Sequence, residues 1–351
     1  MYRFMTLVWL LLFLIISHSV LSDESVASDN KPEISTEGQI KIKVGIFVTD
    51  IYGINFFDNY FITQFWVWFI HSDKAFTPKN GIELPSSRKI EIRNVIREVK
   101  EGVFWDQVKY EVVMNNSWNP TYYPFDHQRI KIYIEVSLAD TEEIILETDD
   151  AGTKISSDVI IPGWTIGNVR ITSSDYSYST TFGDPEMKPE GPSRYSRVTL
   201  SIGMKRMGWR LLFNDFIGFY FSIALAGSVL IINSKRNTIL KISTPLKITL
   251  GSAALFSAVG ASYVLQSKLP MTTQFTLADS IQLTAFGVTA LSMISSIIIE
   301  NLLNENDMKT MDGVTKLKSL NKTLKACRGI LLVVVLILLL DLMILAEAIL
   351  A

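Results

Sequence analysis

Four long apolar segments in the C-terminal part of the chain constrain its fold more than any other feature. They cover about residues 211–233, 242–265, 277–299 and 329–351. Each is close to the roughly 20 residues that an α-helix needs to cross the hydrocarbon core of a bilayer. Residues 23–210 are instead rich in charges of both signs. The sequence therefore predicts a polar domain at 39–206, followed by a four-helix transmembrane domain at 207–351.

The charges of the connections predict how these segments cross the membrane. Residues 233–247 carry four basic residues and no acid, and residues 301–328 carry six basic residues and three acids. Basic connections stay on the cytoplasmic side, so we expect a cytoplasmic linker at 300–328. The polar domain and the C-terminus then lie outside the cell or in the periplasm. This topology describes a multi-pass protein of the plasma membrane or the bacterial inner membrane.

The first residues have the pattern of a secretory signal. Arg3 precedes an apolar run at 5–16, and the small residues Ser17, Ser19 and Ser22 follow it. The run is shorter than a membrane span, which favours a cleaved signal peptide at 1–22 over a permanent anchor helix. Residues 23–38 are polar and aperiodic, as in a flexible leader.

The polar domain reads as a succession of β-strands. Apolar and polar residues alternate at 42–48, 130–136 and 198–204, and such alternation predicts sheets with one buried face. The run at 61–70 is apolar on both faces, as expected of a central strand. Clusters of Gly, Pro, Asn and Asp separate these runs. We therefore predict an all-β domain, an antiparallel sandwich.

Composition excludes several classes of function. Lys and Arg total 33 against 35 Asp and Glu, so the net charge of −2 gives no electrostatic reason to expect nucleic-acid binding. Cys327 is the one cysteine, so neither an intrachain disulfide nor a cysteine-based zinc cluster can form. His71 and His127 lack metal-ligand spacing, and no catalytic triad or nucleotide-binding motif is present. We expect no enzyme activity, no catalytic or metal site and no cofactor.

The second apolar segment differs from the others because it is rich in Ser, Thr, Ala and Gly. At helical spacing one stripe of it would hold hydroxyl residues at both ends and the bulky apolar Phe256 between them. Small and hydroxyl residues serve either close helix packing or a water-filled path, and composition alone leaves both open. The candidate pore-lining residues of this stripe are Thr249, Ala253, Phe256, Gly260, Tyr263 and Ser267.

Residues 123–128, Tyr-Pro-Phe-Asp-His-Gln, closely resemble the (F/Y)PFDxQ loop of the pentameric ligand-gated ion channels, the Cys-loop receptor superfamily. As in that family, an alternating strand follows. Three further parts of the chain resemble the family in the same order and spacing. Residues 44–68 are similar to the first two strands of bacterial members, and residues 196–200 with Arg206 are similar to the last strand of the sandwich. Residues 245–251 and 269–270 are similar to the two ends of the pore helix.

This resemblance implies an immunoglobulin-like sandwich, a homopentamer in the lipid membrane and a pore lined by the second helix. It also implies ligand sites between adjacent sandwiches. Pro124, Phe125, Asp126 and Arg206 would then couple ligand binding to the pore, with Asp58 on a neighbouring loop. The alternative is that Asp126 caps a turn and Arg206 extends to the lipid headgroups.

Departures from the family pattern are also present. The two cysteines that bridge the loop in animal members are absent, which makes the chain similar to prokaryotic members. Gly218 stands where the first membrane helix of the family has proline, and no WxPD segment lies between Trp68 and Tyr123. One strand of the agonist pocket is therefore missing or rebuilt.

The loop before the last strand matches the flap that closes over agonist in the family, and its clustered aromatic side chains predict a cation–π box for an organic cation. Asp149 lies near the loop that would face it. The alternative is a set of ordinary strand aromatics and a solvated turn. The aromatic candidates are Tyr176, Tyr178, Phe182 and Tyr195.

The sequence thus predicts a ligand-gated channel with an unidentified small-molecule or ionic agonist. Pro245 and Leu246, flanked by Lys247, occupy the positions where cation-selective members place a glutamate ring. This favours anion preference or weak selectivity. The alternatives are a non-conducting receptor or scaffold of the same fold and a cation-selective channel.

Overall fold

The computed structural model describes residues 39–137, 139–183, 193–234, 242–303 and 313–350. The expected signal peptide and leader lie outside these residues. The described elements are β1 (Ile40–Asn55), β2 (Tyr60–His71), α2 (Pro78–Gly81), β3 (Ile82–Glu83), β4 (Ser87–Lys100), β5 (Val103–Asn115), β6 (His127–Val136), β7 (Ile144–Thr148), β8 (Lys154–Ile155), β9 (Trp164–Tyr178), β10 (Ser193–Arg206), α3 (Trp209–Ser234), α5 (Thr244–Gln266), α6 (Leu277–Leu303) and α7 (Gly313–Leu350).

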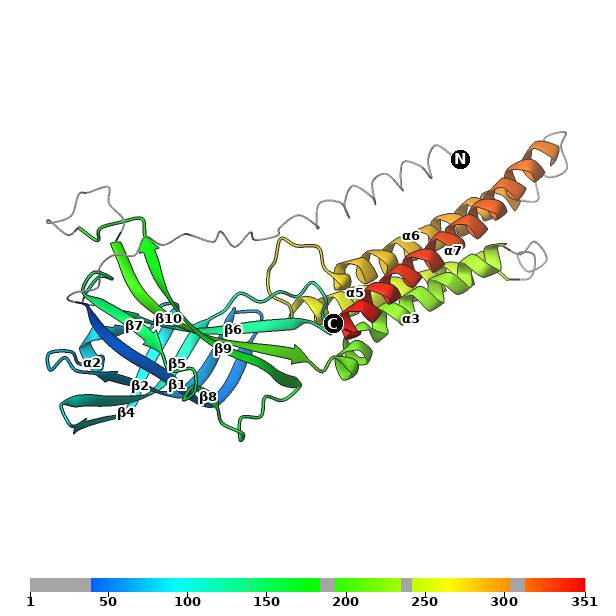
Figure 1. The fold of residues 1–351 in the computed structure, drawn as a ribbon. Helices are drawn as coiled ribbons and strands as arrows, with labels where there is room; N and C mark the ends of the chain where they lie inside the picture. The colour runs from blue at the N-terminus through cyan, green and yellow to red at the C-terminus, as the bar shows by residue number, and fades with distance from the viewer. Residues whose placement is uncertain (1–38, 138, 184–192, 235–241, 304–312, 351) are drawn as a thin grey trace. The chain divides into compact units, whose positions relative to one another are not determined.

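The strands form two sheets (Figure 1). One has the order β4-β5-β2-β1-β7, with β8 also paired to β1, and the other has the order β3-β6-β10-β9. Most pairs are antiparallel, as the alternating pattern predicts, but β7 and β8 each run parallel to β1. This difference arises because the chain leaves β6 in one sheet and enters the other sheet at β7.

Both sheets contribute side chains to one hydrophobic core. In β1, Ile42, Val44 and Ile46 are fully buried, while the alternating Lys41 and Lys43 are exposed. The run at 61–70 becomes β2, which lies between β5 and β1 with one face buried and the other half-buried. The alternating strands predicted from the sequence are therefore present, and the immunoglobulin-like sandwich remains a prediction.

The interval between Trp68 and Tyr123, where the WxPD segment is absent, holds α2, β3 and a long hairpin of β4 and β5. Glu101 and Gly102 form its turn with φ angles of 53° and 81°. Positive φ at both central residues is the conformation that suits a tight hairpin with strongly twisted strands. The interval thus contributes two full strands to the larger sheet.

Four helices, α3, α5, α6 and α7, are long and apolar enough to cross a membrane. They form a bundle with two hydrophobic clusters (Figure 1). The chain is therefore a β-rich domain followed by a multi-pass membrane domain. Helix α7 begins at Gly313, inside the connection expected at 300–328. Leu320, Leu324 and Cys327 recur at helical spacing and are buried. This charged segment therefore has an apolar face that packs against the bundle, and it forms the first part of α7.

Candidate functional site

The loop at residues 121–126 joins β5 to β6 and contacts the membrane helices. Tyr123 and Phe125 are buried in the same hydrophobic cluster as residues of α3, α5 and α6. The ring of Phe125 meets that of Trp209 edge-on, with centroids 5.1 Å apart. At the start of α6, the backbone N–H of Leu277 donates a hydrogen bond of 2.9 Å to the carbonyl oxygen of Thr121. This loop is thus one place where the β-rich domain touches the helices.

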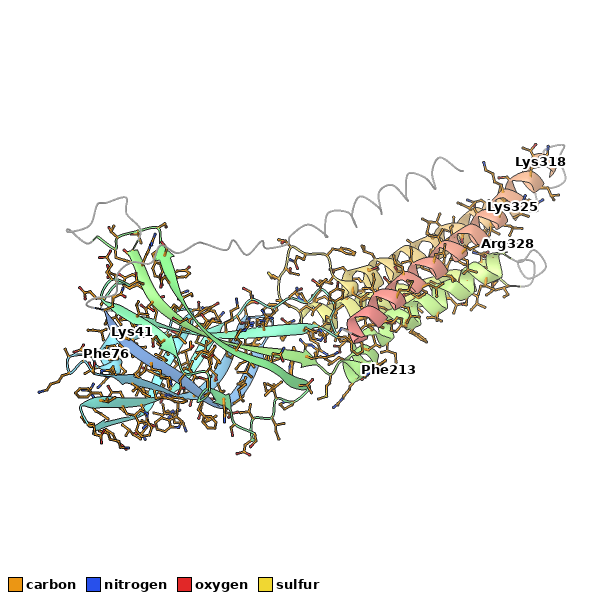
Figure 2. All side chains as sticks on the ribbon, viewed as in Figure 1. Lys41, Phe76, Phe213, Lys318, Lys325 and Arg328 are labelled. Carbon is orange, nitrogen blue, oxygen red and sulfur yellow. The ribbon has the colours of Figure 1, made fainter. Side chains whose placement is uncertain are left out.

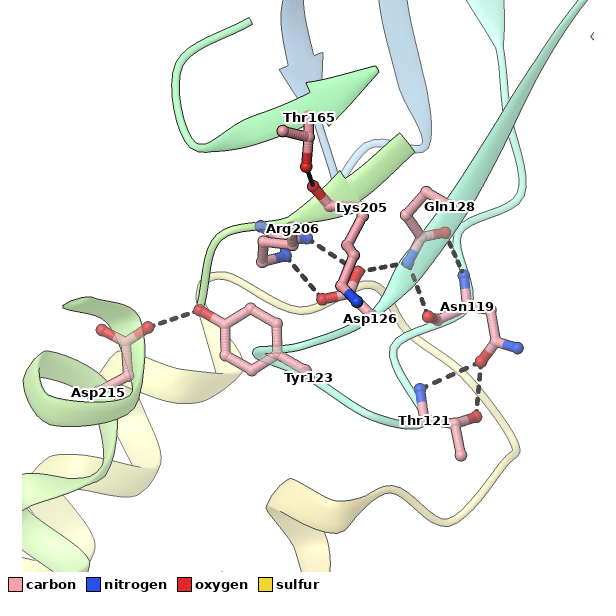
Figure 3. Close-up of polar contacts among 9 residues, drawn as sticks. All are labelled: Asn119, Thr121, Tyr123, Asp126, Gln128, Thr165, Lys205, Arg206 and Asp215. Atoms are coloured by element: carbon pink, nitrogen blue, oxygen red, sulfur yellow. Dashed lines mark hydrogen bonds and ion pairs between the residues drawn. The ribbon is translucent and has the colours of Figure 1, made fainter. Parts of the chain in front are cut away.

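Asp126, at the end of this loop, forms a buried ion pair with Arg206, at the end of β10 (Figure 3). Nε of Arg206 donates to Oδ1 of Asp126 at 2.6 Å, and a second guanidinium nitrogen donates to Oδ2 at 3.2 Å. The side-chain amide of Gln128 donates to the same carboxylate at 2.5 Å. Because the backbone N–H of Arg206 also donates to the Asp126 carbonyl at 3.1 Å, the pair is fixed through both main chain and side chain.

Aromatic rings surround the guanidinium of Arg206. Its central carbon lies 4.1 Å from the ring centroid of Trp164, 4.3 Å from that of Phe56 and 5.1 Å from that of Tyr123. Faces of aromatic rings attract cations, and they do so more strongly away from water. The carboxylate of Asp126 and these rings together compensate the cost of burying the arginine charge.

A second polar contact joins the loop to the helices. The hydroxyl of Tyr123 donates to Oδ2 of Asp215 at 2.5 Å, and Nζ of Lys268 donates to Oδ1 of the same carboxylate at 2.5 Å. Burial raises the pKa of Tyr123, and its hydrogen bond to Asp215 raises it further, so the phenol stays a donor. Asp215 belongs to α3 and Lys268 follows α5, so one carboxylate connects three segments.

Sequence reasoning missed Asp215 and its pairing with Lys268. The available signal is that Asp215 is an isolated acid in an apolar helix, where a buried carboxylate requires a partner. Its partners lie far away in the chain, however, and no local pattern identifies them.

The structure brings most of the predicted coupling residues together. Pro124, Phe125 and Asp126 lie in the loop, and Arg206 contacts Asp126 directly. Asp58 does not join this group, because its side chain accepts a hydrogen bond of 2.9 Å from the amide of Asn55 at the surface. From the same turn it is the ring of Phe56 that reaches Arg206. The coupling role of all these residues remains a prediction.

The predicted pore-lining stripe of α5 is exposed along its whole length in the single chain. Phe256 is 76% exposed and Tyr263 is 80% exposed, and the four other stripe residues are also exposed. The opposite side of α5, which includes Gly251, Ala254 and Ala258, is buried against the bundle. Packing within one chain therefore does not account for the small and hydroxyl residues of the stripe.

Lys247 lies on the buried side of α5 and is only 1% exposed. It precedes the buried Gly251 by one helical turn and points away from the exposed stripe. The adjacency of Lys247 to Pro245 and Leu246 in the sequence therefore does not make it part of the stripe, which holds no charged side chain from Thr249 to Ser267.

No family model and no curated protein sequence matches the chain. The resemblance to the pentameric channels consequently depends on the quoted residues and on the arrangement of the described structure, and function is a matter for proposal.

The aromatic candidates of β9, β10 and their connection form one cluster. The ring centroid of Tyr178 lies 4.8 Å from that of Tyr176, 5.2 Å from that of Phe182 and 5.8 Å from that of Tyr195. The predicted aromatic side chains are thus brought together by strand pairing and by the bend at Phe182. Residues 184–192, which belong to the same loop, lie outside the described residues.

Arg197 supplies a cation to this aromatic cluster from within the chain. Its guanidinium carbon lies 3.5 Å from the ring centroid of Tyr176, and its nitrogen pairs with Glu135 at 2.6 Å. Burial raises the pKa of Tyr178 to about 12, and its hydrogen bond to Glu135 acts in the same direction. The cluster therefore holds a buried guanidinium whose charge is balanced by the carboxylate of Glu135.

Asp149 has different partners. It accepts a hydrogen bond of 3.1 Å from the indole N–H of Trp68 and forms an ion pair of 3.1 Å with Lys43. Burial acts to raise the pKa of Asp149, but the hydrogen bonds from Lys43 and Trp68 outweigh it and the pKa lies below its ordinary value. These contacts attach Asp149 to β1 and β2, in the other sheet from the aromatic cluster.

Within the described residues, no group of three or more His, Cys, Asp or Glu side chains is arranged to hold a metal ion. The carboxylate of Asp341, in α7, accepts a hydrogen bond of 2.7 Å from Ser280 of α6. This contact agrees with the expectation that an acid within a membrane helix faces another helix.

Proposed function

We propose that the chain is one subunit of a homopentameric ligand-gated ion channel. Ligand binding to the β-rich domain opens a pore that five copies of α5 line together. The exposed stripe of α5, from Thr249 to Ser267, carries this proposal. The proposal assigns no enzymatic reaction and no cofactor to the protein.

Association of several copies explains why the stripe is exposed in one chain. The hydroxyls of Thr249 and Ser267 donate hydrogen bonds to carbonyl oxygens of the same segment. A helix face of small and hydroxyl residues nevertheless suits an aqueous path shared by several copies better than it suits lipid tails. The β-rich domain offers a second unpartnered surface. Ile90, Ile92 and Val95 of the edge strand β4 are exposed large apolar side chains. Exposed apolar edges usually mark contacts with another chain.

The aromatic residues of the stripe supply a gate. Phe256 and Tyr263 lie two helical turns apart on the same face of α5, and five copies of each form two rings around the pore axis. A ring of large apolar side chains closes a narrow pore by excluding water from it. A rotation or tilt of α5 that moves Phe256 off the axis opens the path.

The junction described above supports coupling between the two domains. The loop at 121–126 is bonded to the end of β10 through Asp126 and Arg206, and to α3 through Tyr123 and Asp215. Lys268, at the end of the pore helix, shares Asp215. A movement of the loop is therefore transmitted to the pore helix through bonded groups.

We propose weak ion selectivity. The stripe itself holds no charge, and Lys247 is buried on the other side of α5. Without a charged ring along the stripe, neither cations nor anions gain a strong electrostatic preference there. Reversal potentials in a salt gradient measure this directly, and a potential that follows one ion alone contradicts weak selectivity.

The test is to reconstitute the full chain in planar bilayers and to record single-channel currents against amines, acids and pH steps. We expect particles with five times the mass of one chain and discrete openings. Phe256→Ala should raise the current recorded without agonist, because it widens the gate. Leu255→Ala is the matched control, since Leu255 is exposed but lies about 120° away from the stripe on α5. Monomeric or dimeric particles, or equal basal currents in both variants, would contradict the proposal.

A non-conducting receptor or scaffold of the same fold is the second candidate. The large exposed rings of Phe256 and Tyr263 favour it, because two aromatic rings in series can keep the path permanently closed. Pentamers that bind ligand but pass no current, even as Phe256→Ala, would favour this candidate.

A further inference from the structure

Helix α7 is longer than a membrane requires. It has 38 residues, which at 1.5 Å per residue extend over about 57 Å. Its apolar part, residues 329–350, spans about 33 Å and is sufficient to cross the hydrocarbon core of about 30 Å. The first part of α7, residues 313–328, therefore extends beyond the hydrocarbon core into the headgroup layer and the adjacent water.

One face of this extension is strongly basic. Its side chains are exposed and recur at intervals of three or four residues, which places them along one side of the helix (Figure 2). Leu320, Leu324 and Cys327 occupy the opposite side and are buried in a cluster with residues of α3, α5 and α6. We call the exposed residues the basic stripe: Lys318, Lys322, Lys325 and Arg328.

The basic stripe has no acidic neighbours along its own helix. From Gly313 to Leu340 the sequence of α7 contains no Asp or Glu. Within the described part of the chain, Lys318, Lys322 and Lys325 form no ion pair. A concentrated positive charge on a rigid, packed helix thus faces outward at the edge of the bundle.

The depth of each residue follows from the helical rise. Arg328 directly precedes the apolar part, and Lys325, Lys322 and Lys318 lie about 6, 10 and 16 Å from Gly329 along the axis. A headgroup layer is about 5–8 Å thick on each side of the core. Arg328 and Lys325 therefore lie at the level of the lipid phosphates. The backbone of Lys322 lies a few ångströms beyond this layer, and its long side chain can extend back to it.

We propose that the basic stripe binds the headgroup phosphates of anionic phospholipids in the leaflet that surrounds the start of α7. Clusters of basic residues next to a membrane helix attract anionic lipids, and each residue near the surface strengthens binding by about fivefold. The contribution of each lysine to lipid binding falls with its distance from the phosphates. Lys325 therefore contributes most, Lys322 less and Lys318 least. This site requires only that α7 crosses a membrane and is independent of channel activity.

The test uses the full chain reconstituted in phosphatidylcholine vesicles that contain traces of spin-labelled phosphatidylglycerol or spin-labelled phosphatidylcholine. The fraction of immobilised label gives the association constant of each lipid with the protein. We expect preferential association of phosphatidylglycerol, and we expect salt to weaken it because exposed charges are screened. Lys325→Gln should lower the association constant of phosphatidylglycerol about fivefold, and Lys318→Gln should lower it least.

The control is Lys79→Gln combined with Lys154→Gln, which removes two exposed lysines from the β-rich domain and should change nothing. Lys325→Arg keeps the charge and should retain the preference. Equal association of both lipids with the unaltered chain overturns the proposal. So does a preference that survives removal of Lys322 and Lys325 together. Displacement of the labelled lipid by soluble glycerol phosphate also overturns it, since that result assigns the site to a free phosphate.

Discussion

The hydroxyl of Tyr123 and the carboxylate of Asp215 are joined by a hydrogen bond of 2.5 Å, although 92 positions separate them in the sequence. Asp215 is almost fully buried and also accepts from Lys268. A buried carboxylate is stable only when its oxygens have partners. This one therefore holds the loop at 121–126, helix α3 and the end of α5 in a single arrangement, and each partner can be removed separately.

Tyr123→Phe removes one partner and keeps the ring. We expect the free energy of unfolding to fall by about 1.5–3 kcal/mol, the usual contribution of a hydrogen bond to a charged group. Thermal unfolding of the purified protein in detergent measures the change. Tyr122→Phe is the matched control because Tyr122 is an exposed neighbour in the same loop. A similar loss in both variants would mean that the Tyr123–Asp215 bond does not stabilise the junction.

The Asp126–Arg206 pair should behave as one unit. Asp126→Asn or Arg206→Gln leaves an unpaired charge in a buried site, which costs about 3–5 kcal/mol in comparable cases. The double variant has no unpaired charge, so we expect it to be more stable than the sum of the single losses predicts. Thermal unfolding of the four proteins gives the coupling energy, and a value near zero would show that the two residues do not interact.

Arg206→Lys separates charge from shape at the same position. Lysine keeps the positive charge but loses the planar fork that lies against Trp164 and Phe56. We therefore expect Arg206→Lys to restore only part of the stability lost in Arg206→Gln. Full restoration would show that charge alone matters at this position.

The sequence predicted the strands well because their chemistry is local. In β1, alternation of Ile42, Val44 and Ile46 with polar residues is enough to specify a strand with one buried face. The exposed stripe of α5 was likewise predictable, because helical spacing alone groups Thr249 with Ser267. These inferences need no knowledge of the remaining chain.

The junction was predictable only in part. The Asp126–Arg206 contact followed from resemblance to a family, since two residues 80 positions apart share no local pattern. Asp215 and its pairing with Lys268 were missed for the same reason. The start of α7 was predicted too late in the chain. The lysines at 316–325 are typical of a linker, and the apolar face of this segment is too narrow to indicate a helix. The burial of Lys247 could not be predicted either, because adjacency in sequence does not reveal which side of a helix is buried.

The stability of the β-rich domain should depend on pH through Asp106. Burial acts to raise the pKa of this carboxyl, but hydrogen bonds from Arg97 and His71 outweigh it, so its pKa lies below the ordinary value of 3.8. A carboxyl whose pKa is lowered by folding stabilises the folded state above its unfolded pKa. That contribution is lost as the pH falls through the folded pKa.

We therefore expect the unfolding temperature to fall as the pH is lowered from about 5 to about 3. Asp106→Asn removes the titrating group, so the difference between this variant and the unaltered protein should shrink over the same range. Glu98→Gln is the control, because Glu98 is exposed and, in the described part of the chain, its ion-pair partner is the exposed Lys100. A difference that stays constant from pH 5 to pH 3 would exclude Asp106 as the source.

The approach of the loop to the start of α3 requires glycine at position 208. A Cβ atom placed there would lie 2.1 Å from the carbonyl oxygen of Pro124, and this oxygen belongs to backbone that cannot rotate away. Gly208→Ala must therefore push the loop from α3, which strains the Tyr123–Asp215 bond and the packing of Phe125. We expect a loss of stability larger than that of Tyr123→Phe.

Gly227→Ala provides the comparison, since an added Cβ in the middle of α3 meets nothing within 4 Å. Alanine is favoured over glycine within a helix, so Gly227→Ala should be neutral or stabilising. If Gly208→Ala unfolds at the same temperature as Gly227→Ala, the close contact between the loop and α3 is not part of the folded protein.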